Sequence, residues 1–131
     1  MLDTQSLIWL LMKPSQIGKK ALRHIERARA DSTLCVSALT FWEAGQVFDK
    51  AGQAIHVSMA EWRLAVLNSG IEEVPLNGLM ALRAEELLGA HPDPFDRFIL
   101  ATAEARKASL MTSDHVLLKW RGSIRCYNVH E

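Results

Sequence analysis

Short apolar segments alternate along this chain with longer segments of helical periodicity, and this alternation most limits how the chain can fold. The expected strands have no polar residue at every second position, so we expect both faces of their sheet to be buried. These strands are the segments 1–3, 34–36, 71–74, 110–112 and 124–129. Buried strands that alternate with helices are typical of a parallel sheet between two helical layers. We therefore predict an α/β fold, a three-layer α/β/α domain with a short central parallel sheet.

Residues that cap helix ends mark several of the expected helices. Ser58 and Glu61 form a capping box, Asn77 precedes another helix, and Asp93 and Pro94 begin a further one. The expected helical segments are 7–12, 17–29, 37–51 with a stop at Gly52, 62–67, 77–88, 93–107 and 113–120. The chain has 131 residues, of which 49% are hydrophobic, so it is long enough for one domain with its own core, over residues 1–131.

The overall charge is balanced, with 15 basic and 15 acidic residues. This balance argues against nucleic-acid binding through total charge, although it allows a local basic face. Four basic residues share one face of the expected helix 17–29, namely Lys19, Lys20, Arg23 and Arg27. A solvated helix face is the simpler interpretation, and a patch that contacts phosphates or a protein partner is the alternative. In the second case, charge reversal on this helix should weaken RNA binding and its salt dependence.

The sequence shows no pattern of membrane insertion or export. No apolar run is long enough to span a bilayer, and the first residues have neither a basic leader nor a small-residue cleavage site. Cys35 and Cys126 stand in apolar segments without the spacing of metal ligands, so we expect both to be reduced core residues. These patterns favour a cytoplasmic protein without membrane contact.

Two acidic residues lie within expected helices at positions that face apolar neighbours. Asp96 is in the first turn of its helix, on the same side as Ile99. The simpler explanation for Asp96 is that it stabilises the helix dipole and the unpaired N–H groups. Glu43 shares a helical face with Val47. A carboxylate in such surroundings is costly unless it is paired, ligated or able to reach the solvent at the rim.

Two further acids directly follow expected strands. Asp3 follows the first strand and Asp114 follows the strand 110–112, while Glu43 is in the helix after the second strand. In parallel sheets, ligands bind beyond the carboxyl ends of the strands. We therefore expect four carboxylates at one edge of the sheet, with three hydroxyl groups nearby. The acids are Asp3, Glu43, Asp96 and Asp114, and the hydroxyl groups belong to Thr4, Thr112 and Ser113.

Clustered carboxylates raise one another's pKa unless a cation lies among them. Oxygen ligands favour a hard ion, which makes Mg²⁺ the expected cofactor and Mn²⁺ a possible substitute. Such an ion can lower the pKa of a bound water, orient it for in-line attack and neutralise developing charge. The reaction that these properties favour is hydrolysis of a phosphodiester bond.

Four segments resemble the PIN-domain ribonucleases, and specifically the VapC-type toxins of bacterial toxin–antitoxin pairs. They are MLDTQSLIWLL, VSALTFWEAGQV, HPDPFDRFILATA and LMTSD. The resemblance covers nearly the whole chain in the order of the family. The resemblance implies that the acids of the family correspond here to Asp3, Glu43, Asp96 and Asp114, as Mg²⁺ ligands. It further implies RNA cleavage, a homodimer and a cognate antitoxin, a segment of which occupies the acidic groove.

The sequence departs from the family pattern at several positions. Gln5 stands where relatives often have histidine, and His115 is among the residues after Asp114 where many PIN domains have a further acid. The second metal position therefore has no evident ligand. Asp93 resembles a family position, but we assign it to the helix cap. His91 also resembles one, and we expect it to make a structural hydrogen bond.

Two other functions compete with a nuclease. A phospho-receiver module would need an acid beside Asp3 and a lysine after the last strand, and the sequence has neither. A non-catalytic binding domain on the same scaffold is the second alternative. The absence of a further acid after Asp114 favours it, and the presence of all four other acids argues against it. We interpret the four tryptophans as core or dimer contacts rather than as base-stacking platforms; they are Trp9, Trp42, Trp62 and Trp120.

Overall fold

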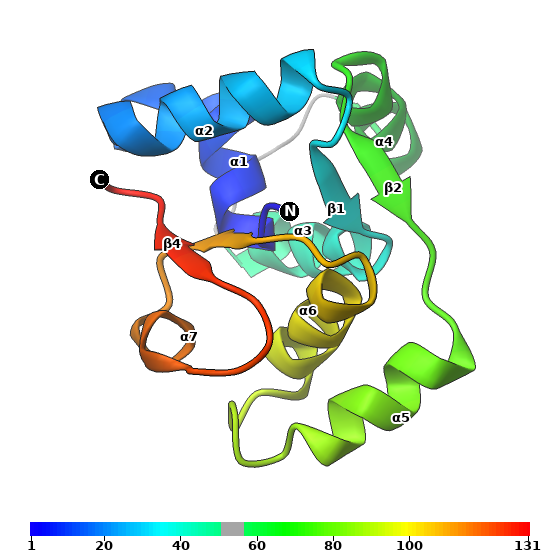
Figure 1. The fold of residues 1–131 in the computed structure, drawn as a ribbon. Coiled ribbons are helices and arrows are strands. Elements are labelled where there is room, and N and C mark those ends of the chain that lie inside the picture. The colour runs from blue at the N-terminus through cyan, green and yellow to red at the C-terminus, as the bar shows by residue number, and fades with distance from the viewer. Residues whose placement is uncertain (51–56) are drawn as a thin grey trace.

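The computed structural model describes residues 1–50 and 57–131 (Figure 1). The helices are α1 (Thr4–Met12), the 3-10 helix η1 (Pro14–Gln16), α2 (Lys19–Ala30), α3 (Leu39–Lys50), α4 (Met59–Asn68), α5 (Gly78–Glu86), α6 (Pro94–Ala105) and α7 (His115–Lys119). The strands are β1 (Cys35–Ser37), β2 (Glu72–Val74), β3 (Leu110–Thr112) and β4 (Cys126–Asn128). The expected end of the third helix, near Ala51 and Gly52, lies outside the described residues.

All strand pairs are parallel, and the first residues of the chain join them into one layer. β1 pairs with β2, and β3 pairs with β4. Between β1 and β3, the N–H of Leu2 donates to the carbonyl of Cys35 (2.9 Å) and the N–H of Asp3 donates to that of Met111 (3.0 Å). The order across the layer is therefore β2, β1, the segment 1–3, β3 and β4. The predicted α/β fold with a short parallel sheet is confirmed.

Neighbouring residues of each central strand point into two different hydrophobic clusters. Val36 and Met111 belong to one cluster, together with buried side chains of the first four α-helices. Cys35 and Leu110 belong to the other, together with buried side chains of α5, α6 and α7. Side chains alternate across a strand. Because both faces are covered, the strands show no alternation of apolar and polar residues.

The element boundaries differ from the sequence prediction by a few residues, and α1 and α4 begin earlier than expected, at Thr4 and Met59. The expected strands 71–74 and 124–129 are shortened to β2 and β4, which are the outermost strands and only partly buried. The expected helix 77–88 ends as α5 at Glu86. Cys35 is buried, Cys126 is partly buried, and both are free thiols. Within the described residues, no helix has the length and apolar character needed to cross a membrane.

Candidate active site

Four acidic side chains line one cavity of about 300 Å³ at the carboxyl edge of the sheet. The acids come from the N-terminal segment, from α3, from α6 and from the residue before α7. The residues that line the cavity are Asp3, Thr4, Gln5, Glu43, Asp96, Ile99, Ser113, Asp114 and His115. The acids predicted from the sequence thus lie together, and their role as metal ligands remains a prediction.

Asp3 is the most deeply buried of these acids. Its carboxylate caps α1, where Oδ1 accepts a hydrogen bond from the N–H of Ser6 at 2.6 Å. Burial raises the pKa of Asp3, while hydrogen bonds from Ser6, Thr112 and Ser113 lower it in part. The hydroxyl of Thr112 and the backbone of Ser113 therefore support this acid.

Glu43 extends from α3 into the cavity, where the hydroxyl of Thr4 donates a hydrogen bond to its Oε2. Burial raises the pKa of Glu43, and the charges of Asp3 and Asp93 raise it further. The Glu43 side chain is therefore a member of the acidic group rather than an acid that escapes to the solvent.

Asp96 lies in the first turn of α6, where other acids surround it. Burial raises its pKa, and the charges of Glu43, Asp93 and Asp114 add to this effect. His91 opposes them, and the pKa of Asp96 is about 7. This carboxyl group is a weak acid because both desolvation and like charge disfavour its ionised form.

Asp114 caps α7 and differs from the other three acids. Its Oδ1 accepts hydrogen bonds from the N–H groups of Val116 (2.6 Å) and Leu117 (3.0 Å). Burial raises the pKa of Asp114, but these backbone donors and His91 outweigh burial and hold the pKa below its ordinary value. The hydroxyl of Thr112 accepts a hydrogen bond from the N–H of Asp114 at 3.0 Å.

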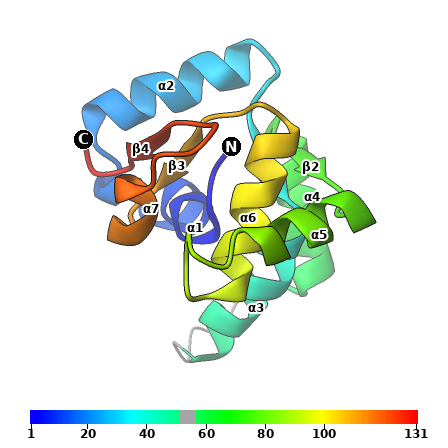
Figure 2. The ribbon, with the colours of Figure 1, turned by 60° about the horizontal axis from the view of Figure 1, so that its bottom comes forward.

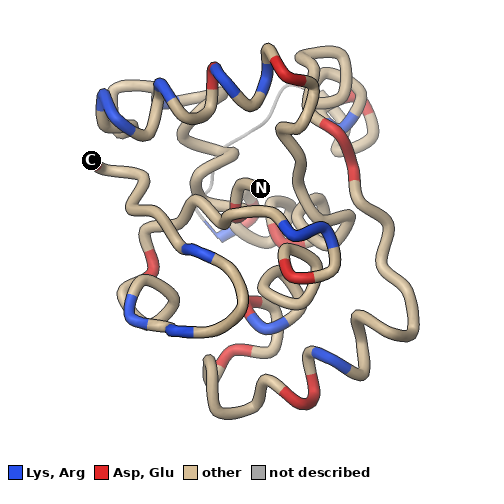
Figure 3. Tube along the Cα trace, in the orientation of Figure 1, with Lys and Arg blue, Asp and Glu red and all other residues tan. Residues whose placement is uncertain are grey.

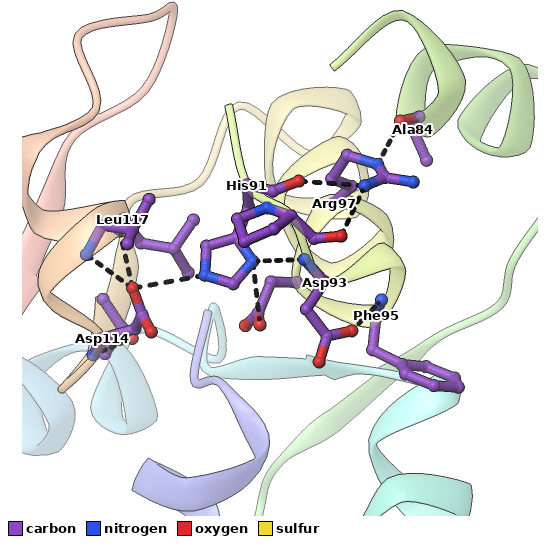
Figure 4. A network of polar contacts seen from close by, with 11 residues as sticks. Ala84, His91, Asp93, Phe95, Arg97, Asp114 and Leu117 are labelled. Carbon is purple, nitrogen blue, oxygen red and sulfur yellow. Dashed lines mark hydrogen bonds and ion pairs between the residues drawn. The ribbon is translucent and has the colours of Figure 1, made fainter. Parts of the chain in front are cut away.

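His91 lies between two of the acids, with 7% of its surface exposed (Figure 4). Its Nδ1 accepts a hydrogen bond from the N–H of Asp93 at 3.0 Å and lies 3.3 Å from Oδ2 of Asp96. Its Nε2 lies 3.5 Å from Oδ1 of Asp114. Because Nδ1 is an acceptor, the proton of the neutral imidazole is on Nε2, facing Asp114. The expected structural hydrogen bond is confirmed, but nothing in the sequence pattern indicated the position between two acids.

Asp93 and Arg97 organise the start of α6. Oδ1 of Asp93 accepts a hydrogen bond from the N–H of Phe95 at 2.8 Å, which confirms the predicted cap. The charge of Asp93 also raises the pKa of Glu43 and of Asp96, so Asp93 belongs electrostatically to the acidic group. The Arg97 guanidinium donates to the backbone carbonyls of Ala84, His91 and Pro92 (Figure 4), which is a structural role.

The donor set of the cavity fits a hard divalent cation by its chemistry. The acids present only oxygen ligands. Burial raises the pKa of Asp3, Glu43 and Asp96, repulsion adds to this effect at Glu43 and Asp96, and a cation would relieve both. As they stand, no three acidic, histidine or cysteine side chains of the described residues form a metal-binding group. Two of the carboxylates accept hydrogen bonds from the protein itself, Asp3 from Ser6 and Glu43 from Thr4.

The basic face predicted on α2 lies away from the acidic cavity. Figures 1 and 2 show α2 at the opposite end from the first turn of α6, and Figure 3 shows the basic positions along it. None of Lys19, Lys20, Arg23 and Arg27 lines the cavity. Lys20 forms an ion pair with Glu131 (2.9 Å). Instead, α2 borders a second cavity of about 600 Å³ whose lining contains no acid.

Comparison with known proteins identifies the family. The model of the PIN domain matches residues 1–121, so this chain belongs to the PIN domain family. The family predicted from the sequence segments is therefore confirmed, and the phospho-receiver alternative has no support. No curated protein matches the sequence.

Two solved structures are similar in fold. One is a toxin–antitoxin complex from Klebsiella pneumoniae, with a TM-score of 0.62, 20% identity and coverage of 94% of this chain and 92% of that chain. The other is the crystal structure of VapBC2 from Rickettsia felis bound to a DNA fragment from their promoter. Its TM-score is 0.71 at 18% identity, with coverage of 98% of this chain and 96% of that chain. At these identities the similarity concerns the fold alone.

Proposed function

We propose that this PIN domain is a Mg²⁺-dependent endoribonuclease that acts as the toxin of a toxin–antitoxin pair. The observation that carries the proposal is the single cavity into which four carboxylates extend from four different elements. Packing does not require this arrangement, because burial raises the pKa of three of the acids and repulsion adds to this effect at Glu43 and Asp96. Keeping these carboxylates buried and close together costs free energy, and the binding of a cation and a phosphate at the cavity would offset that cost.

The four carboxylates divide the work of binding and proton transfer. Asp3 and Asp96 would hold the principal Mg²⁺ ion, and Glu43 and Asp114 would complete the site directly or through water. When bound, the ion supplies Lewis acidity to a phosphodiester and lowers the pKa of water. Thr4 engages Oε2 of Glu43, which leaves Oε1 to accept a proton from the attacking water. The backbone N–H groups of α7 hold Asp114 ionised and fix its orientation.

Cleavage of a mixed RNA pool tests this function. The purified chain is incubated with Mg²⁺, with Mn²⁺ and with a chelator, beside Asp96→Asn and the control Glu85→Gln, which changes an exposed acid of α5. We expect metal-dependent cutting by the wild type and the control, and none by Asp96→Asn at matched thermal stability. Cutting that survives both the chelator and Asp96→Asn would contradict the proposal.

A non-catalytic binding domain is the second candidate, because His115 lines the cavity where many PIN domains carry a further acid. It predicts that Mg²⁺ and Mn²⁺ do not bind and that the RNA pool stays intact.

We propose three further properties that go with a toxin of this type. A cognate antitoxin would cover the acidic cavity, which is supported by the fold shared with chains of two solved toxin–antitoxin assemblies. The chain would form a homodimer and act in the cytoplasm. Addition of the antitoxin should abolish cleavage, and cleavage unaffected by a bound antitoxin would contradict the first of these properties.

Contact between RNA and α2 is a separate proposal. Because α2 lies at the other end of the molecule, only RNA that extends well beyond the acidic cavity would meet its basic face (Figure 1). Charge reversal at Arg23 and Arg27 should weaken the binding of long RNA and reduce the salt dependence, while short RNA binds as before. If the affinity for long RNA were unchanged at every salt concentration, the contact between RNA and α2 would be contradicted.

A further inference from the structure

A pair of stacked aromatic rings lies on the two helices that carry Glu43 and Asp96. Trp42 of α3 stacks on Phe95 of α6 with 4.8 Å between the ring centroids and 20° between the ring planes. Trp42 is 53% exposed although Phe95 covers part of it, so much of the indole is open to solvent. We call this pair the aromatic shelf.

Core packing does not account for the position of Trp42. The other aromatic residues of α3, Phe41 and Phe48, contact Trp62 edge to face at 5.9 and 5.4 Å. Trp62 is buried in the hydrophobic core, and Trp42 takes no part in that cluster. The expectation that Trp62 is a core residue is therefore confirmed, whereas Trp42 stands outside the core.

The aromatic shelf is directly connected to the acids. Trp42 immediately precedes Glu43, and Phe95 immediately precedes Asp96. Both acids line the cavity, and α3 packs against α6. The two helices that position the acids therefore also position the two rings, beside the place where a phosphate would bind.

The size of the exposed apolar surface indicates its occupant. Among the described residues of α3 and α6, Trp42 is the one large apolar side chain that is exposed. The exposed surface is that of a single planar ring. It matches the area of one nucleobase, because aromatic side chains stack bases through their flat faces.

We propose that the aromatic shelf stacks an unpaired base of the RNA strand whose phosphate lies at the acidic cavity. This inference rests on the proposed nuclease function and adds a preference to it. A base can stack on Trp42 only after it leaves its neighbours in a helix, so the site takes single strands and loops in preference to duplexes. Stacking on a ring face is tolerant of base identity, so Trp42 is a positioning residue and contributes little to sequence choice.

RNA binding by matched variants tests the aromatic shelf. Fluorescence anisotropy measures the binding of labelled oligouridylate and of a labelled RNA duplex to full-length protein that also carries Asp96→Asn, which prevents cleavage. Trp42→Ala should weaken oligouridylate binding by about tenfold or more, while Trp42→Phe keeps most of it. Duplex binding should not change. Leu64→Ala, at an exposed leucine of α4, is the control and should bind as its parent.

Cleavage kinetics of variants that retain Asp96 provide a second test. Trp42→Ala should raise KM for single-stranded RNA and leave kcat nearly unchanged, because the ring binds the substrate and does not touch the reacting bond. Thermal midpoints by circular dichroism verify that each variant is folded. If Trp42→Ala is not folded, Trp42→Phe is compared with the wild type in its place.

Three outcomes would overturn the inference. Trp42→Ala could bind and cut single-stranded RNA like the wild type, or its binding of single-stranded RNA and of duplex RNA could weaken equally. It could also keep RNA binding and lose only inhibition by the antitoxin, which would assign the ring to a protein partner. In all three the wild type still cuts RNA, so the proposed function survives. A wild type that neither binds nor cuts RNA would remove both.

Discussion

Single aspartates in this molecule carry a structural and a chemical role at once. Asp3, Asp93 and Asp114 each accept backbone hydrogen bonds at the start of a helix. The positive end of a helix dipole stabilises a carboxylate, so three helix starts reduce the cost of gathering negative charge. Asp96 has no such bond among the described residues, and its pKa is raised to about 7.

The raised pKa of Asp96 predicts a stability that depends on pH in the metal-free protein. The ordinary pKa is 3.8 and the folded value is about 7. The folded state therefore binds the proton more tightly, and the wild type loses stability as pH rises between these values. Asp96→Asn has no charge to bury, so above pH 7 it should be more stable than the wild type by about 1–2 kcal/mol.

Urea denaturation in the presence of a chelator measures this difference. The gain in the free energy of unfolding should be present near pH 8 and should shrink toward pH 4, where the wild-type carboxyl group is protonated. A variant that is less stable than the wild type at pH 8 would show that ionised Asp96 is a favourable partner of His91 instead.

The sequence was sufficient to predict that the four acids lie together and insufficient to predict their surroundings. Asp3 and Asp114 follow strands directly, so the geometry of a parallel sheet brings them together. His91 contacts Asp96 and Asp114 through a loop whose path no periodicity describes. The charge of Asp93 reaches Glu43 across two helices, which also depends on tertiary packing.

At the level of elements, very short strands and helix starts define the site. β1 and β3 have three residues each and are fully buried, yet they bring the carboxyl ends of the sheet together. The segment before Asp3 forms a single bridge, between Leu2 and Met111. Helix caps fix Asp3 before α1 and Asp114 before α7, whereas Glu43 and Asp96 lie within α3 and α6.

Substitutions at Asp114 separate capping from charge. α7 has five residues, so its cap matters for its stability. Asparagine caps as well as aspartate, so Asp114→Asn should keep the free energy of unfolding within about 0.5 kcal/mol. Asp114→Ala should lose about 1 kcal/mol. Denaturation by urea gives both values, and an equal loss in the two variants would contradict the capping role.

Periodicity predicts which residues share a helix face but not where that face lies. The basic face of α2 was evident from the spacing of Lys19, Arg23 and Arg27. Its distance from the acids follows from the path of the chain after α1, which turns through η1 before α2 begins. For the same reason, the spacing of Trp42 in α3 did not distinguish a core position from an exposed one.

At the level of the whole molecule, two hydrophobic clusters meet across the sheet and leave an apolar surface on α5. Leu79 and Leu82 of α5 are 78% and 66% exposed. Exposed apolar residues on one helix are typical of a contact surface. This surface lies away from the acids, since no residue of α5 lines their cavity.

The proposed homodimer predicts that this surface is used. Light scattering after size exclusion should give the mass of a dimer for the wild type and of a monomer for Leu79→Glu, because a buried unpaired charge is costly at an interface. Leu64→Glu, at a leucine of α4 that is 54% exposed, is the control and should remain a dimer. A monomeric wild type, or a dimer that persists in Leu79→Glu, would contradict this assignment.

The most direct test of the account is the binding of a divalent cation by the four carboxylates. Calorimetric titration with Mn²⁺ and Mg²⁺ is carried out on the wild type, Asp3→Asn, Asp96→Asn and the control Glu85→Gln. Asp3→Asn retains a side chain that can cap α1, so it isolates the loss of charge. We expect binding to the wild type and the control, and at least about tenfold weaker binding to the two site variants. Absence of binding to the wild type, or affinity unchanged in both site variants, would contradict the metal site.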